Sequence, residues 1–145
     1  MKKQFVKVVL NGNLRWVDRE ANYAGWTDNP GWDKYPSLAV WGGMKNTKRC
    51  LDIFIHECLH SCDGSAVELL VEKAATKVAG FLWRKGLRYQ PENNKLSGVV
   101  LRVTWFTIKK TITIMLENSE WDKLKVAVTA RDIANALIKV GYRLK

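Results

Sequence analysis

The chain has 145 residues, of which 47% are hydrophobic and 26% charged, and its formal net charge is +10. This length suits one domain, residues 1–145, with a core of its own, and no apolar window is long enough to span a membrane. The basic start is followed by a short apolar run that Lys7 interrupts, so a secretory signal is not expected. The three cysteines have helical spacing, which favours reduced thiols in the cytoplasm over a disulfide framework.

The first third of the chain carries strand and turn signals. Residues 4–10 and 14–18 flank Asn11-Gly12-Asn13, which predicts an N-terminal β-hairpin. Residues 20–36 contain two prolines and two glycines and are expected to form a long loop. Residues 37–41 then predict a short edge strand.

Two consecutive helices are expected in the middle of the chain. The first begins near Asn46-Thr47, either of which can cap it, shows apolar residues at three- and four-residue spacing, and ends at Asp63-Gly64. The second begins at once, because Ser65 and Glu68 match a capping box with Ser65 as the cap. Its apolar stripe continues until Gly86.

The C-terminal third, residues 98–145, is the most basic part of the chain. Residues 98–116 are rich in β-branched and aromatic side chains, which predicts one or two strands, and residues 127–140 predict an amphipathic helix. Residues 130–143 also echo residues 75–88 in their apolar, glycine and arginine positions. Either an internal duplication or two amphipathic helices that end at glycine would explain this echo. The whole pattern predicts a small α+β domain.

The only two histidines occur in the stretch His56-Glu57-Cys58-Leu59-His60. Positions i and i+4 of a helix share a face, so both imidazoles can reach one zinc ion. Glu57 is offset by about 100° around the helix, where it is placed to take a proton from a zinc-bound water. Two buried imidazoles without a partner would cost free energy, which a metal removes.

A catalytic zinc needs a third protein ligand, and the chain offers no third histidine. Glu72 lies on the apolar stripe of the second helix, where a carboxylate needs a partner, so it is the favoured ligand. Glu68 is the next candidate. It ranks below Glu72 because the capping box already assigns it a structural task. Asp63, close to the helix end, is the third.

With these residues the sequence resembles the gluzincins, in which His-Glu-x-x-His is followed by a glutamate on the next helix. Residues 72–82 look like a glutamate- and alanine-containing run of ImmA/IrrE-type metallopeptidases. Residues 55–60 and 71–88 together resemble small phage-encoded proteins with the same motif. The resemblance covers about residues 37–89, which it identifies as a zincin-like metal-binding core. It implies a zinc metallopeptidase, located in the host cytoplasm if the chain is phage-encoded.

The function predicted first is hydrolysis of peptide bonds in a peptide or protein substrate, with one zinc and with Glu57 as general base. The further hydrogen-bond donor that such a reaction uses is sought among Tyr23, Tyr35, Arg88 and Tyr89.

Two other functions stay open. In a non-catalytic binding module or phage effector, zinc would only hold two helices together, and Cys62 or Asp63 would be a fourth ligand. Nucleic acid is a possible partner of the basic C-terminal segment through Trp105, Phe106 and Lys109-Lys110, although the aromatic side chains also suit core packing.

Overall fold

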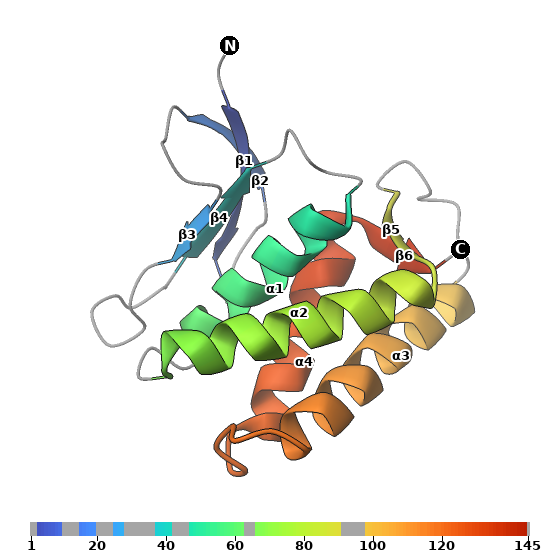
Figure 1. Cartoon of the computed structure of the whole chain (residues 1–145). Coiled ribbons are helices and arrows are strands. Elements are labelled where there is room, and N and C mark those ends of the chain that lie inside the picture. Colours follow the sequence, from blue (N-terminus) through green and yellow to red (C-terminus); the bar gives the residue numbers. More distant parts are fainter. Residues whose placement is uncertain are drawn as a thin grey trace.

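The computed structural model describes residues 3–9, 15–19, 25–27, 37–41, 47–62, 66–90 and 98–144. It shows an α+β domain in which helices predominate (Figure 1). The helices are α1 (Lys48–Cys62), α2 (Glu68–Arg84), α3 (Gly98–Glu117) and α4 (Val126–Val140). The strands are β1 (Lys3–Val9), β2 (Arg15–Arg19), β3 (Gly25–Thr27), β4 (Ser37–Trp41), β5 (Leu87–Tyr89) and β6 (Tyr142–Leu144).

The N-terminal strands form an antiparallel sheet in the order β2-β1-β4-β3, and this sheet contacts α1 (Figure 1). Strand β4 pairs with β1 on one side and with β3 on the other, so the expectation that residues 37–41 form an edge strand is wrong. The partner missed was β3, which lies within the expected loop of residues 20–36. Three residues are too few for periodicity to reveal a strand.

The four helices enclose the core. Helix α1 packs along α2, and α3 packs along α4, with further contacts between α2 and α3 and between α1 and α4. The largest fully buried side chains come from α1, α2, α3 and the segments that follow α2, α3 and α4: Phe54, Leu51, Ile55, Leu59, Leu82, Leu87, Ile108, Ile112, Trp121 and Tyr142. None of the helices in the described part of the chain combines the length and apolar content that a bilayer crossing requires.

Residues 98–117 form one long helix, α3, so the strands expected for 98–116 are wrong. The buried positions Thr104, Ile108, Thr111 and Ile112, followed by Leu116, recur at three- and four-residue spacing. That spacing places them on one face of a helix, which packs against α4 and α2. The β-branched composition of the segment is a weaker determinant than this tertiary packing, which overrides it.

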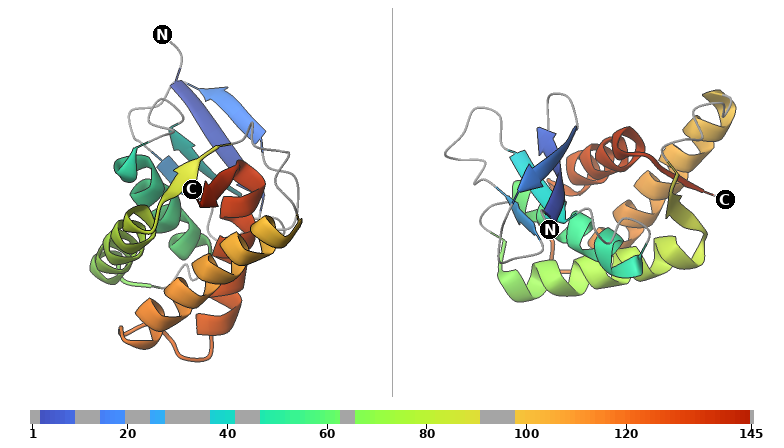
Figure 2. Two further views of the ribbon diagram at one scale, coloured as in Figure 1. Left: turned by 90° about the vertical axis from the view of Figure 1, so that its right-hand side faces the viewer. Right: turned by 90° about the horizontal axis from the view of Figure 1, so that it is seen from above.

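The sequence echo has a structural counterpart in two units of helix, glycine and short strand. Gly86 and Gly141 follow α2 and α4 with φ values of 97° and 120°, and β5 and β6 then pair with each other, Arg88 opposite Arg143 (Figure 2). Arg88 Nη1 donates to the carbonyl oxygens of Trp83 and Leu87 at 2.7 and 2.9 Å. Arg143 Nη1 donates to the corresponding carbonyls 55 positions later, at 2.7 and 2.8 Å.

This correspondence predicts similar energetic roles for Leu82 and Leu137, which occupy equivalent positions and are both fully buried. Leu82→Ala and Leu137→Ala should each lower the free energy of unfolding by about 3 kcal/mol, because each leaves a cavity in the same core. Urea unfolding measures the change. Leu124→Ala is the control, since Leu124 is 90% exposed. A cost below about 1 kcal/mol for one core variant together with a cost of about 3 kcal/mol for the other would contradict the equivalence.

Candidate metal centre

Helix α1 places the two histidines side by side near its C-terminal end. The hydroxyl of Thr47 accepts a hydrogen bond from the amide of Cys50 at 3.1 Å, which confirms the predicted start of the helix. Ile55 and Leu59 are fully buried and hold the helix against the core, while His56 and His60 are half-buried at its edge. The two imidazole rings meet edge to face, with centroids 4.8 Å apart.

The start of α2 brings Glu68 to this pair. Val67 is the residue that caps α2, with extended backbone angles (φ −67°, ψ 135°) and no side-chain capping bond, so Glu68 is the first helical residue. A capping box would need Glu68 at the third helical position, so that interpretation is wrong for Glu68, while Ser65 lies outside the described residues. The carboxylate of Glu68 is therefore free to face α1.

The three side chains converge through atoms that can bind a metal. His56 Nε2 lies 3.0 Å from Glu68 Oε1, His60 Nε2 lies 2.7 Å from Glu68 Oε2, and the two Nε2 atoms are 3.2 Å apart. Ligand atoms about 2.0–2.1 Å from a tetrahedral zinc lie about 3.3 Å from one another. The donor types and their separations thus fit a zinc ion after a small outward movement.

Glu72, the favoured ligand in the sequence, does not join this group. It is exposed one helical turn beyond Glu68 and lines a neighbouring pocket instead. The geometry therefore favours Glu68, the second candidate, as the third ligand. Among the residues that the structure describes, the cluster consists of His56, His60 and Glu68 without Cys62. Asp63 lies outside the described residues.

Glu57 lies beside the cluster in a more enclosed setting. It lines a pocket of about 470 Å³ together with His56, Glu72 and residues of α1 and α2. Burial, and secondarily the negative charge of Glu68, raise the pKa of Glu57 from 4.5 to about 7. A carboxyl group with a pKa near neutrality is suited to both accepting and donating a proton.

The raised pKa gives the metal-free protein a predicted pH dependence. A pKa that is higher in the folded than in the unfolded chain stabilises the fold at low pH, and this contribution is lost as the pH rises through about 7. Glu57→Gln removes the titration. In the presence of a chelator, the variant should gain stability relative to the wild type by on the order of 2 kcal/mol between about pH 5 and pH 8. Urea unfolding across this range measures the stability of both proteins. A stability difference between them that does not change with pH would contradict the raised pKa of Glu57.

Of the additional hydrogen-bond donors considered from the sequence, the two in the described part of the chain, Arg88 and Tyr89, lie away from this site. Arg88 stacks on the Trp83 ring at 3.4 Å and binds backbone carbonyls, and Tyr89 packs edge to face against Tyr142. Both follow the C-terminal end of α2, whose 17 residues separate them from Glu68 by about 25 Å. Tyr23 and Tyr35 lie outside the described residues.

The residues considered for nucleic-acid binding lie on α3 and do not belong to the histidine cluster. Trp105 is half-buried and its indole donates to Asn135 Oδ1 at 2.7 Å, while Lys109 lies 5.1 Å from the centre of its ring. Phe106 and Lys110 are exposed. Trp105 therefore serves packing between α3 and α4, and Phe106 remains on the surface.

Comparison of the chain with models of protein families, with curated proteins and with solved structures gives no match.

Proposed function

We propose that the chain is a zinc-dependent metallopeptidase, with His56, His60 and Glu68 as the zinc ligands and Glu57 as the general base. The observation that carries this proposal is the convergence of three zinc-type donor atoms beside a half-buried carboxyl group whose pKa is raised to about 7. A metal-ligand cluster adjacent to a proton acceptor is the combination that hydrolysis requires.

The degree of exposure supports an open rather than a closed metal site. The Glu68 side chain is 59% exposed, and those of both histidines are 20% exposed. Structural zinc sites are closed by four protein ligands, whereas catalytic sites leave a position for water or substrate. The cluster offers three candidate protein ligands among the described residues, which is the number typical of catalytic sites.

The reaction would divide its tasks between the cluster and Glu57. Zinc, when bound, supplies Lewis acidity, which eases ionisation of water and polarises a peptide carbonyl. Glu57 would accept the proton of the attacking water and later donate it to the leaving amine. The pocket lined by His56, Glu57 and Glu72 provides space for substrate on the same side of α1.

A zinc that only holds α1 and α2 together is the alternative, because the ligands come from both helices. The two helices are also linked without zinc: Thr76 Oγ1 donates to Asp52 Oδ2 at 3.1 Å, and buried apolar residues lie between them. The helix pair therefore has contacts of its own, which favours the catalytic use.

The proposal is tested by cleavage of a mixed-sequence peptide library by purified protein with one equivalent of zinc. Mass spectrometry should detect products, a chelator should abolish their formation, and added zinc should restore it. A protein that binds one zinc per chain and leaves every peptide intact would instead support the structural alternative. Thermal unfolding with and without zinc distinguishes that result from loss of the fold.

A further inference from the structure

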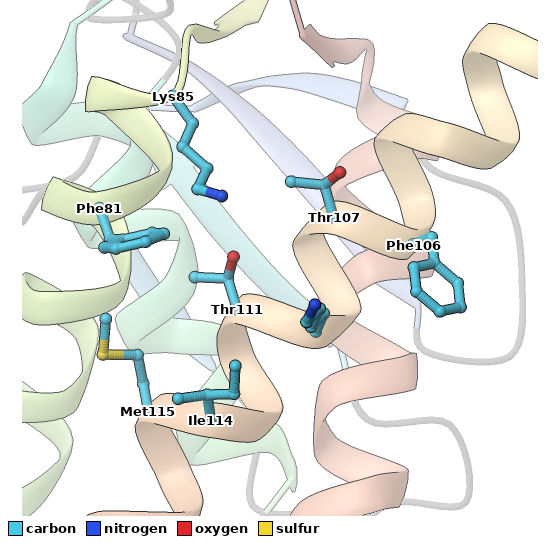
Figure 3. A pocket seen from close by; sticks show the side chains of 8 residues that line it. Phe81, Lys85, Phe106, Thr107, Thr111, Ile114 and Met115 are labelled. Carbon is cyan, nitrogen blue, oxygen red and sulfur yellow. The ribbon is translucent and has the colours of Figure 1, made fainter.

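A groove runs between α2 and α3, separate from the metal cluster. One part has a volume of about 320 Å³. Figure 3 shows Phe81 of α2 and Lys85, which follows α2, extending toward Thr111 and Met115 of α3. A second part of about 510 Å³ lies between the first turns of α2 and the C-terminal end of α3. Met115 lines both parts, so the two parts adjoin at this side chain.

The groove presents large apolar side chains to solvent. Phe106 and Ile114 on α3 are 61% and 45% exposed, and Val67 and Leu69 at the start of α2 are more than half exposed. Phe106 and Ile114 both line the first part, about 80° apart around α3. Exposed apolar residues gathered around a concave surface mark binding sites for partners.

Positive charge surrounds these apolar side chains. Lys85 and Lys110 line the first part, and Lys73 and Lys77 line the second. The Lys85 ammonium lies 5.0 Å from the centre of the Phe81 ring, which keeps the charge at the groove. Glu120 is the one acidic residue in the described lining. The complementary occupant therefore combines an apolar stripe with acidic flanks.

We propose that this groove binds an amphipathic helix with acidic flanks from another protein. Residues 67–85, which include all of α2, border the groove over about 27 Å. A bound helix of about 18 residues has this length. A helix in an apolar groove is a recurrent mode of peptide recognition, with anchors at i, i+3, i+4 and i+7. A second copy of this chain fits poorly, because each copy carries a net charge of +10. This inference goes beyond the proposed peptidase activity.

The test uses a display library of 18-residue helix-forming peptides with glutamate fixed on the flanks and apolar residues varied at the anchor positions. A matched library carries lysine in place of glutamate. Selection on the zinc-loaded full chain should enrich acidic peptides only. In fluorescence anisotropy, Lys110→Glu and Ile114→Asp should each weaken the binding of the recovered peptides about tenfold or more.

Matched variants on α4 provide the controls. Lys139→Glu and Val128→Asp change residues that are exposed like Lys110 and Ile114 but lie outside the groove, and they should bind as the wild type does. Val67 and Leu69 are left unchanged because they flank Glu68. Circular dichroism verifies the fold of each variant.

Three results would overturn the proposal: no acidic peptide is enriched, the lysine library binds equally well, or binding ignores the groove variants. Two further measurements address other occupants. If no peptide is recovered, and the wild type binds phosphatidylserine vesicles whereas Lys110→Glu and Ile114→Asp do not, the groove would be assigned to a lipid surface. Self-association in sedimentation that Ile114→Asp abolishes would assign it to a second copy.

Discussion

Glu57→Gln should lower peptide cleavage by the zinc-loaded protein by about 100-fold or more, while one zinc remains bound. Glutamine keeps the size of the side chain but cannot accept the proton of the attacking water. Because Glu57 does not belong to the ligand cluster, its loss should leave zinc affinity nearly unchanged. The measurement combines kcat/KM for the best library peptide with zinc content by atomic absorption.

Glu117→Gln is a matched control for this result, because Glu117 is an exposed glutamate on α3 outside the proposed site. It should cleave at the rate of the wild type. Equal rates for Glu57→Gln and the wild type would remove the general-base role, and loss of zinc from Glu57→Gln would place Glu57 among the ligands.

Substitution of the two glutamates at the start of α2 should have opposite consequences for zinc. Glu68→Gln removes the anionic ligand that faces both histidines, so zinc affinity should fall by about 100-fold or more. Glu72→Gln changes a neighbouring exposed carboxylate that is not in the cluster, so affinity should stay within about threefold of the wild type. Competition with a chromophoric chelator measures both values.

This pair of variants separates the two third-ligand assignments. Both variants neutralise one glutamate on one helix, so a general effect of charge would weaken zinc binding equally in each. A large loss in Glu72→Gln together with a small one in Glu68→Gln would restore the assignment that the sequence alone favoured.

The parts of the fold that the sequence predicted are those in which local signals and packing agree. Thr47 caps α1, Gly86 follows the end of α2, and α4 covers the expected helix of residues 127–140. In α3 the local signals and the packing disagree. The β-branched side chains favour strands locally, whereas the buried positions at helical spacing determine the structure. The three-residue strands β3, β5 and β6 are too short for a periodic signal.

The candidate site, like the fold, was predictable from the sequence only in part. The spacing of His56 and His60 places them on one face of any helix, so that pair followed from sequence alone. The third ligand depended on where α2 begins, and helix boundaries are the least certain part of such an inference. The observed cap is Val67, two residues after the expected Ser65. Glu68 is therefore the first helical residue, and its carboxylate faces the histidines.

The most direct test of the account is zinc X-ray absorption spectroscopy on the wild-type protein with one equivalent of zinc. Two imidazole nitrogens and carboxylate oxygen are expected at about 2.0–2.2 Å, and His56→Ala should reduce the imidazole contribution to that of one ring. A sulfur neighbour at about 2.3 Å would show a cysteine ligand such as Cys62 and contradict the proposed centre. Failure of the protein to retain zinc at micromolar concentration would contradict it as well.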